Sequence, residues 1–286
     1  MKKTKVIIPA LGILLLSTAA SVTGTVAWFS MNSEVTASGM NLKAKAENGI
    51  LISNNNSENA ADWKEAATAL YDGTVGDPAA QAEFIPTSTY DATTWAHANS
   101  NTAASHAATS EYVVYSVGGE GIAEANGIGS KAGQNYYLLN NFYIKSSGAQ
   151  FTSDLKVEEV NATGSSASTE LNKSLRVLIK SGSNVKVFAP FAPTQATDLT
   201  YNVAKASGAA ATVAKQSVTA IDSSDPDAVS EVLIAGATIP AYAATSGITV
   251  NVYVYFEGED VNCKSANITT TLDTLALNIK FSAIDA

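Results

Sequence analysis

Alternation of apolar and polar side chains with a period of two is the feature that most constrains this 286-residue chain. Residues 248–256 and 272–281 both show it. The first segment places Val250, Val252 and Val254 on one face, and the second places Leu277 and Ile279 on one face. A period of two predicts β-strands that are buried on one side. About ten short segments of strand-forming residues with polar joints predict an all-β chain, an antiparallel β-sandwich or jelly roll.

The remaining expected elements follow from the same patterns. Strands are predicted over residues 50–53, 112–117, 136–145, 155–160, 175–180, 185–188 and 232–234. The strand over 136–145 is expected to break at Asn140-Asn141, and a tight turn is expected at residues 48–49. A short helix is predicted over 60–71, because Trp63, Ala66, Ala67 and Leu70 share one helical face. Residues 73–110 and 190–230 show little periodicity and are predicted to be long loop insertions. Residues 47–286 therefore read as one β-sandwich domain with two insertions.

The first 27 residues read as a secretory signal peptide. Lys2, Lys3 and Lys5 precede an apolar run over residues 6–16, and small residues follow. This order is that of a signal peptide, with cleavage by signal peptidase expected between Ala27 and Trp28. The chain is therefore expected outside the cell or on the cell surface. The alternative is an uncleaved membrane tether, since the weaker apolar stretch to residue 29 extends the run.

Residues 28–46 form a strand segment with a change of phase. The apolar row Phe29, Met31, Val35 and Ala37 has one parity, whereas Met40, Leu42, Ala44 and Ala46 have the other. Such a change requires a bulge or turn, and Gly39 lies where the two rows meet. The sequence predicts two linked strands with Gly39 as the joint.

Charge and cysteine content exclude some classes of protein. The formal net charge is −9, which argues against nucleic acid as a partner. Cys263 is the single cysteine, so the chain has no intrachain disulfide and needs a hydrophobic core. Cys263 itself is expected to be a small buried side chain, with an intermolecular bridge as the alternative.

No catalytic motif is found, and the chain is not predicted to be an enzyme or to hold a cofactor. His97 and His106 lie nine residues apart without a zinc-protease pattern, and no Gly-x-Ser-x-Gly or phosphate-binding loop occurs. The acidic turn of Asp222, Asp225 and Asp227 is a weak calcium candidate. A second acidic cluster, residues 257–260, is predicted to be a solvated strand end.

Two runs carry a resemblance to a known family: TVAWFS at residues 25–30 and VTASGMNLKA at residues 35–44. Their order and spacing resemble the start of the TasA/camelysin family of secreted proteins from Gram-positive bacteria, over residues 1–46. The resemblance implies a jelly-roll-like domain and assembly into pilus-like fibres of the biofilm matrix. It further implies a homopolymer in which the mature N-terminal strand adds to the sheet of the next subunit.

The donor strand would comprise Trp28 to Ala37, with Phe29, Met31, Val35 and Ala37 inserted and Gly39 as pivot. The alternatives are that this segment pairs within its own subunit, or stays tethered to the membrane. A different function is a monomeric adhesin or ligand-binding module that uses the two insertions. A hydrolase is the third and weakest hypothesis.

Overall fold

The computed structural model describes the parts of the chain that form the folded body. These are residues 35–37, 41–47, 49–68, 82–98, 112–125, 127–163, 171–191, 199–207, 210–220, 229–258, 260, 263 and 276–283. Nearly all of this body is β-structure, and two short 3-10 turns, η1 (Ala60–Asp62) and η3 (Leu171–Ser174), are the helical elements within it. The predicted all-β class is confirmed.

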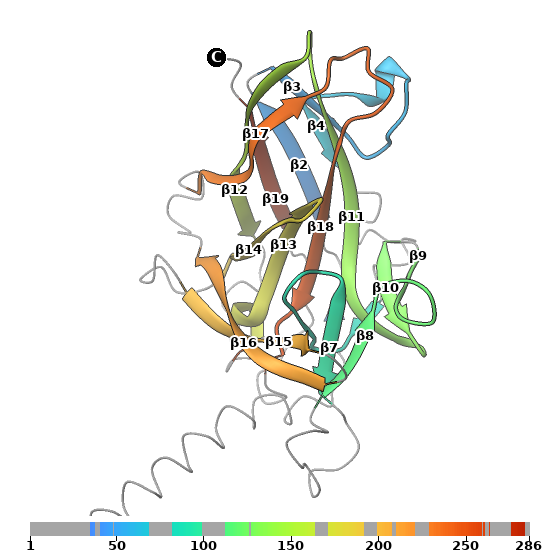
Figure 1. Ribbon diagram of the computed structural model, residues 1–286, viewed down its shortest axis with the longest axis vertical. Coiled ribbons are helices and arrows are strands. Elements are labelled where there is room, and N and C mark those ends of the chain that lie inside the picture. The colour runs from blue at the N-terminus through green and yellow to red at the C-terminus, as the bar shows by residue number, and fades with distance from the viewer. Residues whose placement is uncertain are drawn as a thin grey trace, which may run out of the picture.

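The strands of the described chain form three sheets (Figure 1). The larger sheet has the order β1 (Val35–Ala37), β5 (Ala82–Phe84), β11 (Gln134–Ser146), β18 (Ile248–Phe256), β13 (Leu175–Ser181), β14 (Asn184–Ala189), β16 (Ala210–Ala220), β15 (Leu199–Ser207). Three further strands join it off this path: β3 (Ile50–Ser53), β9 (Ala123–Ala125) and β10 (Ile128–Lys131). The smaller sheet has the order β17 (Glu231–Ile239), β12 (Phe151–Thr163), β19 (Ala276–Ser282), β2 (Asn41–Glu47), β4 (Ala66–Thr68). A third, three-stranded sheet consists of β6 (Ser88–Thr89), β7 (Thr94–Ala98) and β8 (Tyr112–Ser116).

The main hydrophobic core lies between the larger and the smaller sheet. On β2, Leu42 and Ala44 are buried while Lys43 and Lys45 are exposed, as the alternation predicts. β18 contributes Val250, Val252, Val254 and Phe256, and β19 contributes Leu277, Ile279 and Phe281. The predicted inward rows of the two C-terminal strands therefore build the core of a sandwich.

Most strand pairs are antiparallel, and a few are parallel. β2 runs parallel to β19 over its whole length, from Asn41 opposite Ala276 to Glu47 opposite Ser282. The turn at Gly49, with φ +81°, does not close a hairpin: it passes the chain from β2 in the smaller sheet to β3 in the larger. The topology confirms an antiparallel β-sandwich in outline, and the jelly-roll order stays a prediction.

The predicted helix over 60–71 is wrong in its described part. Only Ala60–Asp62 is helical, as a 3-10 turn capped by the Asn59 side chain, and Ala66–Thr68 forms strand β4 on the edge of β2. The small side chains of Ala66 and Ala67 would bury little apolar surface on a helix face, so packing gives a helix little stability here. Pairing with β2 satisfies their backbone groups and places Ala67 opposite Ala44.

Both predicted loop insertions contain strands. The first includes β5, β6 and β7, and the second includes β15 and β16, a long antiparallel hairpin from Leu199 opposite Val218 to Ser207 opposite Ala210. The predicted break at Asn140-Asn141 is also absent: the two residues pair with Val252 and Asn251 in an uninterrupted ladder. Polar and small residues suggested loops, but backbone pairing with neighbouring strands decides these segments.

A second core lies on the other face of the larger sheet, under the three-stranded sheet. Trp95 of β7 is fully buried, its ring stacks on Tyr137 at a centroid distance of 4.0 Å, and it meets Tyr255 edge-on at 5.2 Å. The cluster further contains Tyr136, Leu139, Leu178, Val187 and Tyr253. The larger sheet is thus buried on both faces at the end where β7 and β8 lie (Figure 1).

Candidate functional site

The candidate functional site is the edge of the larger sheet formed by β1 and β5. Three pairs define an antiparallel register: Val35 opposite Phe84, Thr36 opposite Glu83, and Ala37 opposite Ala82. Among the strands that the structure describes, β1 is the terminal strand of its sheet and pairs with β5. The next described strand along the chain, β2, belongs to the smaller sheet.

Of the residues predicted to act at the N-terminal side, Val35 and Ala37 lie in β1. The predicted cleavage residues Ala27 and Trp28, and the donor residues Phe29, Met31 and Gly39, lie outside the described residues. Within its own chain, β1 pairs with β5. One of the expected alternatives, pairing within the subunit, is therefore what this single chain displays for Val35–Ala37.

Backbone hydrogen bonds hold β5 and the residues just after it to the sandwich independently of β1. The Ile85 N–H donates to the Asn135 carbonyl at 2.9 Å, which joins the end of β5 to β11. The Thr87 N–H donates to the Phe256 carbonyl at 2.9 Å, and the Gly258 N–H donates to the Thr87 carbonyl at 3.0 Å. The outer edge of β5 is therefore a fixed template on which a strand can be laid.

A buried polar cluster lies just beyond this fastening, after β18. The side chains of Arg176 and Asp260 form an ion pair with exposures of 1% and 0%, and the Arg176 Nη1 also donates to the carbonyls of Lys173 and Leu175 at 2.7 and 2.9 Å. Glu257 is equally buried. The prediction of a solvated strand end for residues 257–260 is wrong for Glu257 and Asp260. The ion pair with the guanidinium of Arg176, from β13, compensates for the burial of the Asp260 carboxylate.

Cys263 is buried in the same cluster. Burial is the main cause that raises the pKa of its thiol well above the ordinary value, and a hydrogen bond with Ser174 partly opposes this. A thiol that stays protonated and shielded is a poor nucleophile and a poor partner for a disulfide. The expectation of a small buried side chain is confirmed.

The native chain is therefore expected to leave Cys263 unlabelled by a thiol reagent at pH 8 over minutes, whereas the chain unfolded in denaturant reacts at one thiol per chain. Ellman's reagent or maleimide labelling followed by mass spectrometry measures this. Rapid stoichiometric labelling without denaturant would contradict the burial. Labelling of a Gly148→Cys variant serves as the accessible control, because Gly148 is exposed and a Cβ there meets open space.

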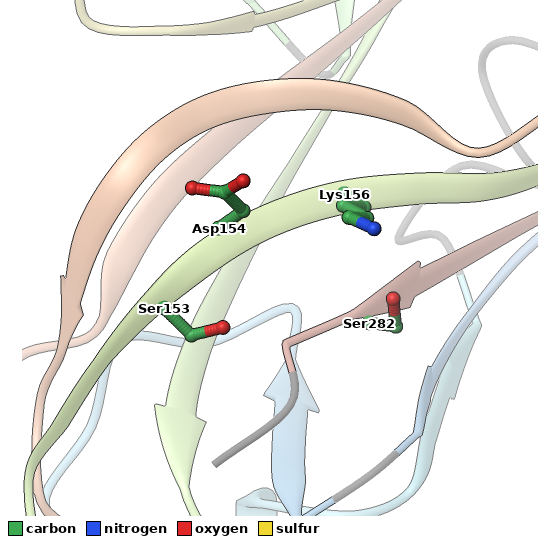
Figure 2. Close-up of a pocket in the computed structure, with 4 residues that line it drawn as sticks. All are labelled: Ser153, Asp154, Lys156 and Ser282. Carbon is green, nitrogen blue, oxygen red and sulfur yellow. The ribbon is translucent and has the colours of Figure 1, made fainter. Parts of the chain in front are cut away.

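A small polar cavity of about 170 Å³ lies on the smaller sheet, lined by Ser153, Asp154, Lys156 and Ser282 (Figure 2). Its groups are already engaged in part: Asp154 accepts a hydrogen bond from the Gly236 N–H at 2.8 Å, and the Ser282 hydroxyl donates to Glu158. Figure 2 shows the Asp154 and Lys156 side chains pointing apart rather than toward a common centre. The cavity has room for water or a small polar molecule.

The remaining predicted site residues divide between two places. His97 lies in β7, where its ring packs near Tyr136 and Tyr115 at centroid distances of 5.4 and 5.8 Å, so it belongs to the aromatic core. His106 and the calcium candidates Asp222, Asp225 and Asp227 lie outside the described residues. Among the residues that the structure describes, no group of three or more His, Cys, Asp or Glu side chains is placed to hold a metal ion.

The aromatic core was missed by sequence reasoning, although a signal for it exists. In β18, Tyr253 and Tyr255 occupy the outward parity, and in β7, Trp95 and His97 share one parity. Burial raises the pKa of Tyr253 to about 12 and raises the pKa of Tyr255 well above its ordinary value. In β18, aromatic residues on the outward parity together with valines on the inward parity indicate burial on both faces.

No described helix is long and apolar enough to cross a membrane. Comparison of the chain with protein-family models, with curated protein sequences and with solved structures finds no match. The resemblance to the TasA/camelysin family therefore stays a prediction from the sequence, mainly from residues 1–46.

Proposed function

We propose that this protein is a secreted structural subunit of an extracellular surface or biofilm-matrix fibre. Subunits join head-to-tail, and the mature N-terminal segment of one subunit supplies a strand to the sheet of the next. Signal peptidase cleavage after Ala27 frees that segment. Until cleavage, the apolar leader tethers the segment to the membrane, so release and assembly are coupled.

The observation that carries this proposal is the place of β1 in the sandwich. β1 is a three-residue strand at the end of the larger sheet, where β5 is its neighbour among the described strands, whereas the next described strand, β2, lies in the smaller sheet. A segment held in this way can leave the sheet without opening the core, which lies between other strands. Its alternation of side chains extends upstream through Met31 and Phe29.

The physics of strand addition agrees with such a role. A strand laid on a sheet edge gains main-chain hydrogen bonds, and alternate side chains give the contact its specificity. Because the donor segment and the acceptor edge are different surfaces of one subunit, the contact is head-to-tail and builds a filament unless it closes into a ring. Each inserted apolar side chain contributes about 1.5–3 kcal/mol when fully buried.

Truncation tests the proposal directly. We expect the chain that starts at Trp28 to form filaments at rising concentration, and the chain that starts at Ser38 to remain monomeric, because the latter lacks the whole donor strand. Negative-stain electron microscopy and sedimentation measure assembly, and circular dichroism verifies that the shortened chain keeps its β-structure. N-terminal sequencing of the exported protein verifies cleavage after Ala27.

A matched pair of substitutions separates strand donation from a general effect of the segment. Phe29→Asp places a charge in the inserted row, and Ser30→Asp places the same charge on the opposite parity. Phe29→Asp is expected to raise the concentration needed for assembly by at least about tenfold, corresponding to about 1.4 kcal/mol, and Ser30→Asp much less. Filaments that persist without residues 28–37 would contradict strand donation. A chain starting at Trp28 that stays monomeric at every concentration and binds a ligand would favour the adhesin alternative.

A further inference from the structure

The edge of β5 that faces outward is occupied by β1 of the same chain. The pairing is antiparallel and covers all three residues of both strands. Val35 and Ala37, which face Phe84 and Ala82 in this register, are also the last two members of the apolar row that the proposed function assigns to the donated strand. The same residues therefore have two uses that exclude each other.

We infer that β1 is a self-inhibiting strand, and that the outer edge of β5 is the acceptor for β1 of a neighbouring subunit. In the single chain, β1 blocks this edge. In the fibre, β1 of the neighbour takes the same edge in the same antiparallel register. This inference rests on the proposed function and adds to it the acceptor strand, the register and the step that regulates joining.

The acceptor edge of β5 is expected to keep its position when β1 leaves. β5 is bonded to β11 through Asn135, and the chain just after it is bonded to the end of β18 through Thr87. Phe84 is buried in the main core, with 3% of its surface exposed. Withdrawal of β1 thus removes one neighbour of β5 and leaves its other attachments, so that the edge stays in position to receive a strand.

The exchange itself is nearly balanced in energy, because the contacts of β1 within the chain are remade between chains. A tethered strand sees its own acceptor at an effective concentration in the millimolar range, which favours the closed single chain at micromolar protein. Joining between chains then needs a high local concentration, as at a cell surface, or the extra burial of Phe29 and Met31. Opening of β1 precedes every addition to the fibre.

A reversible lock tests the inference. Ala37 and Ala82 are opposite each other, and directly opposed residues of an antiparallel pair have Cα atoms about 4.5–5.5 Å apart, within the range of a disulfide. The double variant Ala37→Cys/Ala82→Cys, in the chain that starts at Trp28, is oxidised either as dilute monomer or after assembly. The single variants Ala37→Cys and Ala82→Cys control for the cysteines and for pairing with Cys263.

Oxidation of the monomer should form the bond within one chain and reduce filament yield at least about tenfold, since no open chain remains, and reduction should restore assembly. Oxidation after assembly should link neighbouring chains and give a ladder on a non-reducing gel. Both results together support the inference. A locked monomer that polymerises normally, or filaments that give no ladder, would overturn it while strand donation as tested by truncation still stands. A wild-type chain that never polymerises would overturn the proposed function and this inference with it.

Discussion

Replacing Arg176 with methionine is expected to cost about 3–5 kcal/mol of unfolding free energy, because it breaks a buried ion pair. The guanidinium is 1% exposed, pairs with Asp260 and donates to two backbone carbonyls. Its removal leaves the buried carboxyl group of Asp260 without the positive charge that it pairs with. Urea unfolding followed by tryptophan fluorescence measures the change.

The control for this prediction is an ion pair of similar chemistry in a different environment. Lys186 and Glu231 lie 2.8 Å apart with side-chain exposures of 37% and 32%. Glu231→Gln is expected to change the unfolding free energy by at most about 1 kcal/mol, because solvent screens the pair and competes for both groups. The double variant Arg176→Met/Asp260→Leu should be more stable than Arg176→Met alone, since it removes the uncompensated charge. Equal losses at the buried and the exposed pair would contradict this account.

Replacing Trp95 with alanine is expected to cost about 3–5 kcal/mol. Trp95 is the fully buried centre of the second core, where its ring contacts Tyr137, Tyr253 and Tyr255 at centroid distances of 4.0, 5.8 and 5.2 Å. The loss of stability should fall mainly on the three-stranded sheet, because Trp95 is its fully buried aromatic side chain in this cluster. Hydrogen exchange should therefore rise in β6, β7 and β8 before it rises in β11 and β18.

A glycine on the facing side gives a matched test of the same cluster. A Cβ added at Gly129 would lie 2.1 Å from the Tyr137 ring, so Gly129→Ala must displace the ring on which Trp95 stacks. Gly148→Ala introduces the same methyl group into open space at an ordinary backbone conformation and should change stability by no more than about 0.5 kcal/mol. If Gly129→Ala is as harmless as Gly148→Ala, the second core does not hold the three-stranded sheet.

The candidate site could be predicted only in part from the sequence. The change of phase between residues 37 and 40 indicated that β1 and β2 are separate strands, and the structure places them in different sheets. The partner of β1 could not be predicted, because β5 is a three-residue strand within a stretch rich in small and polar residues. A strand this short gives no periodic signal, and the residues just after it bond to Asn135 and Phe256, which come from distant parts of the chain.

The sequence by itself determined the all-β class, the inward rows of β2, β18 and β19, and the burial of Cys263, because each follows from local alternation or from composition. Tertiary structure alone decided that residues 66–68 form a strand, that the two insertions contribute strands, and that Glu257 and Asp260 are buried beside Arg176. These outcomes depend on which backbone edge or charged group arrives from elsewhere in the chain. Backbone hydrogen bonds between strands and the pairing of buried charges are contacts between distant residues, and no local pattern encodes their partners.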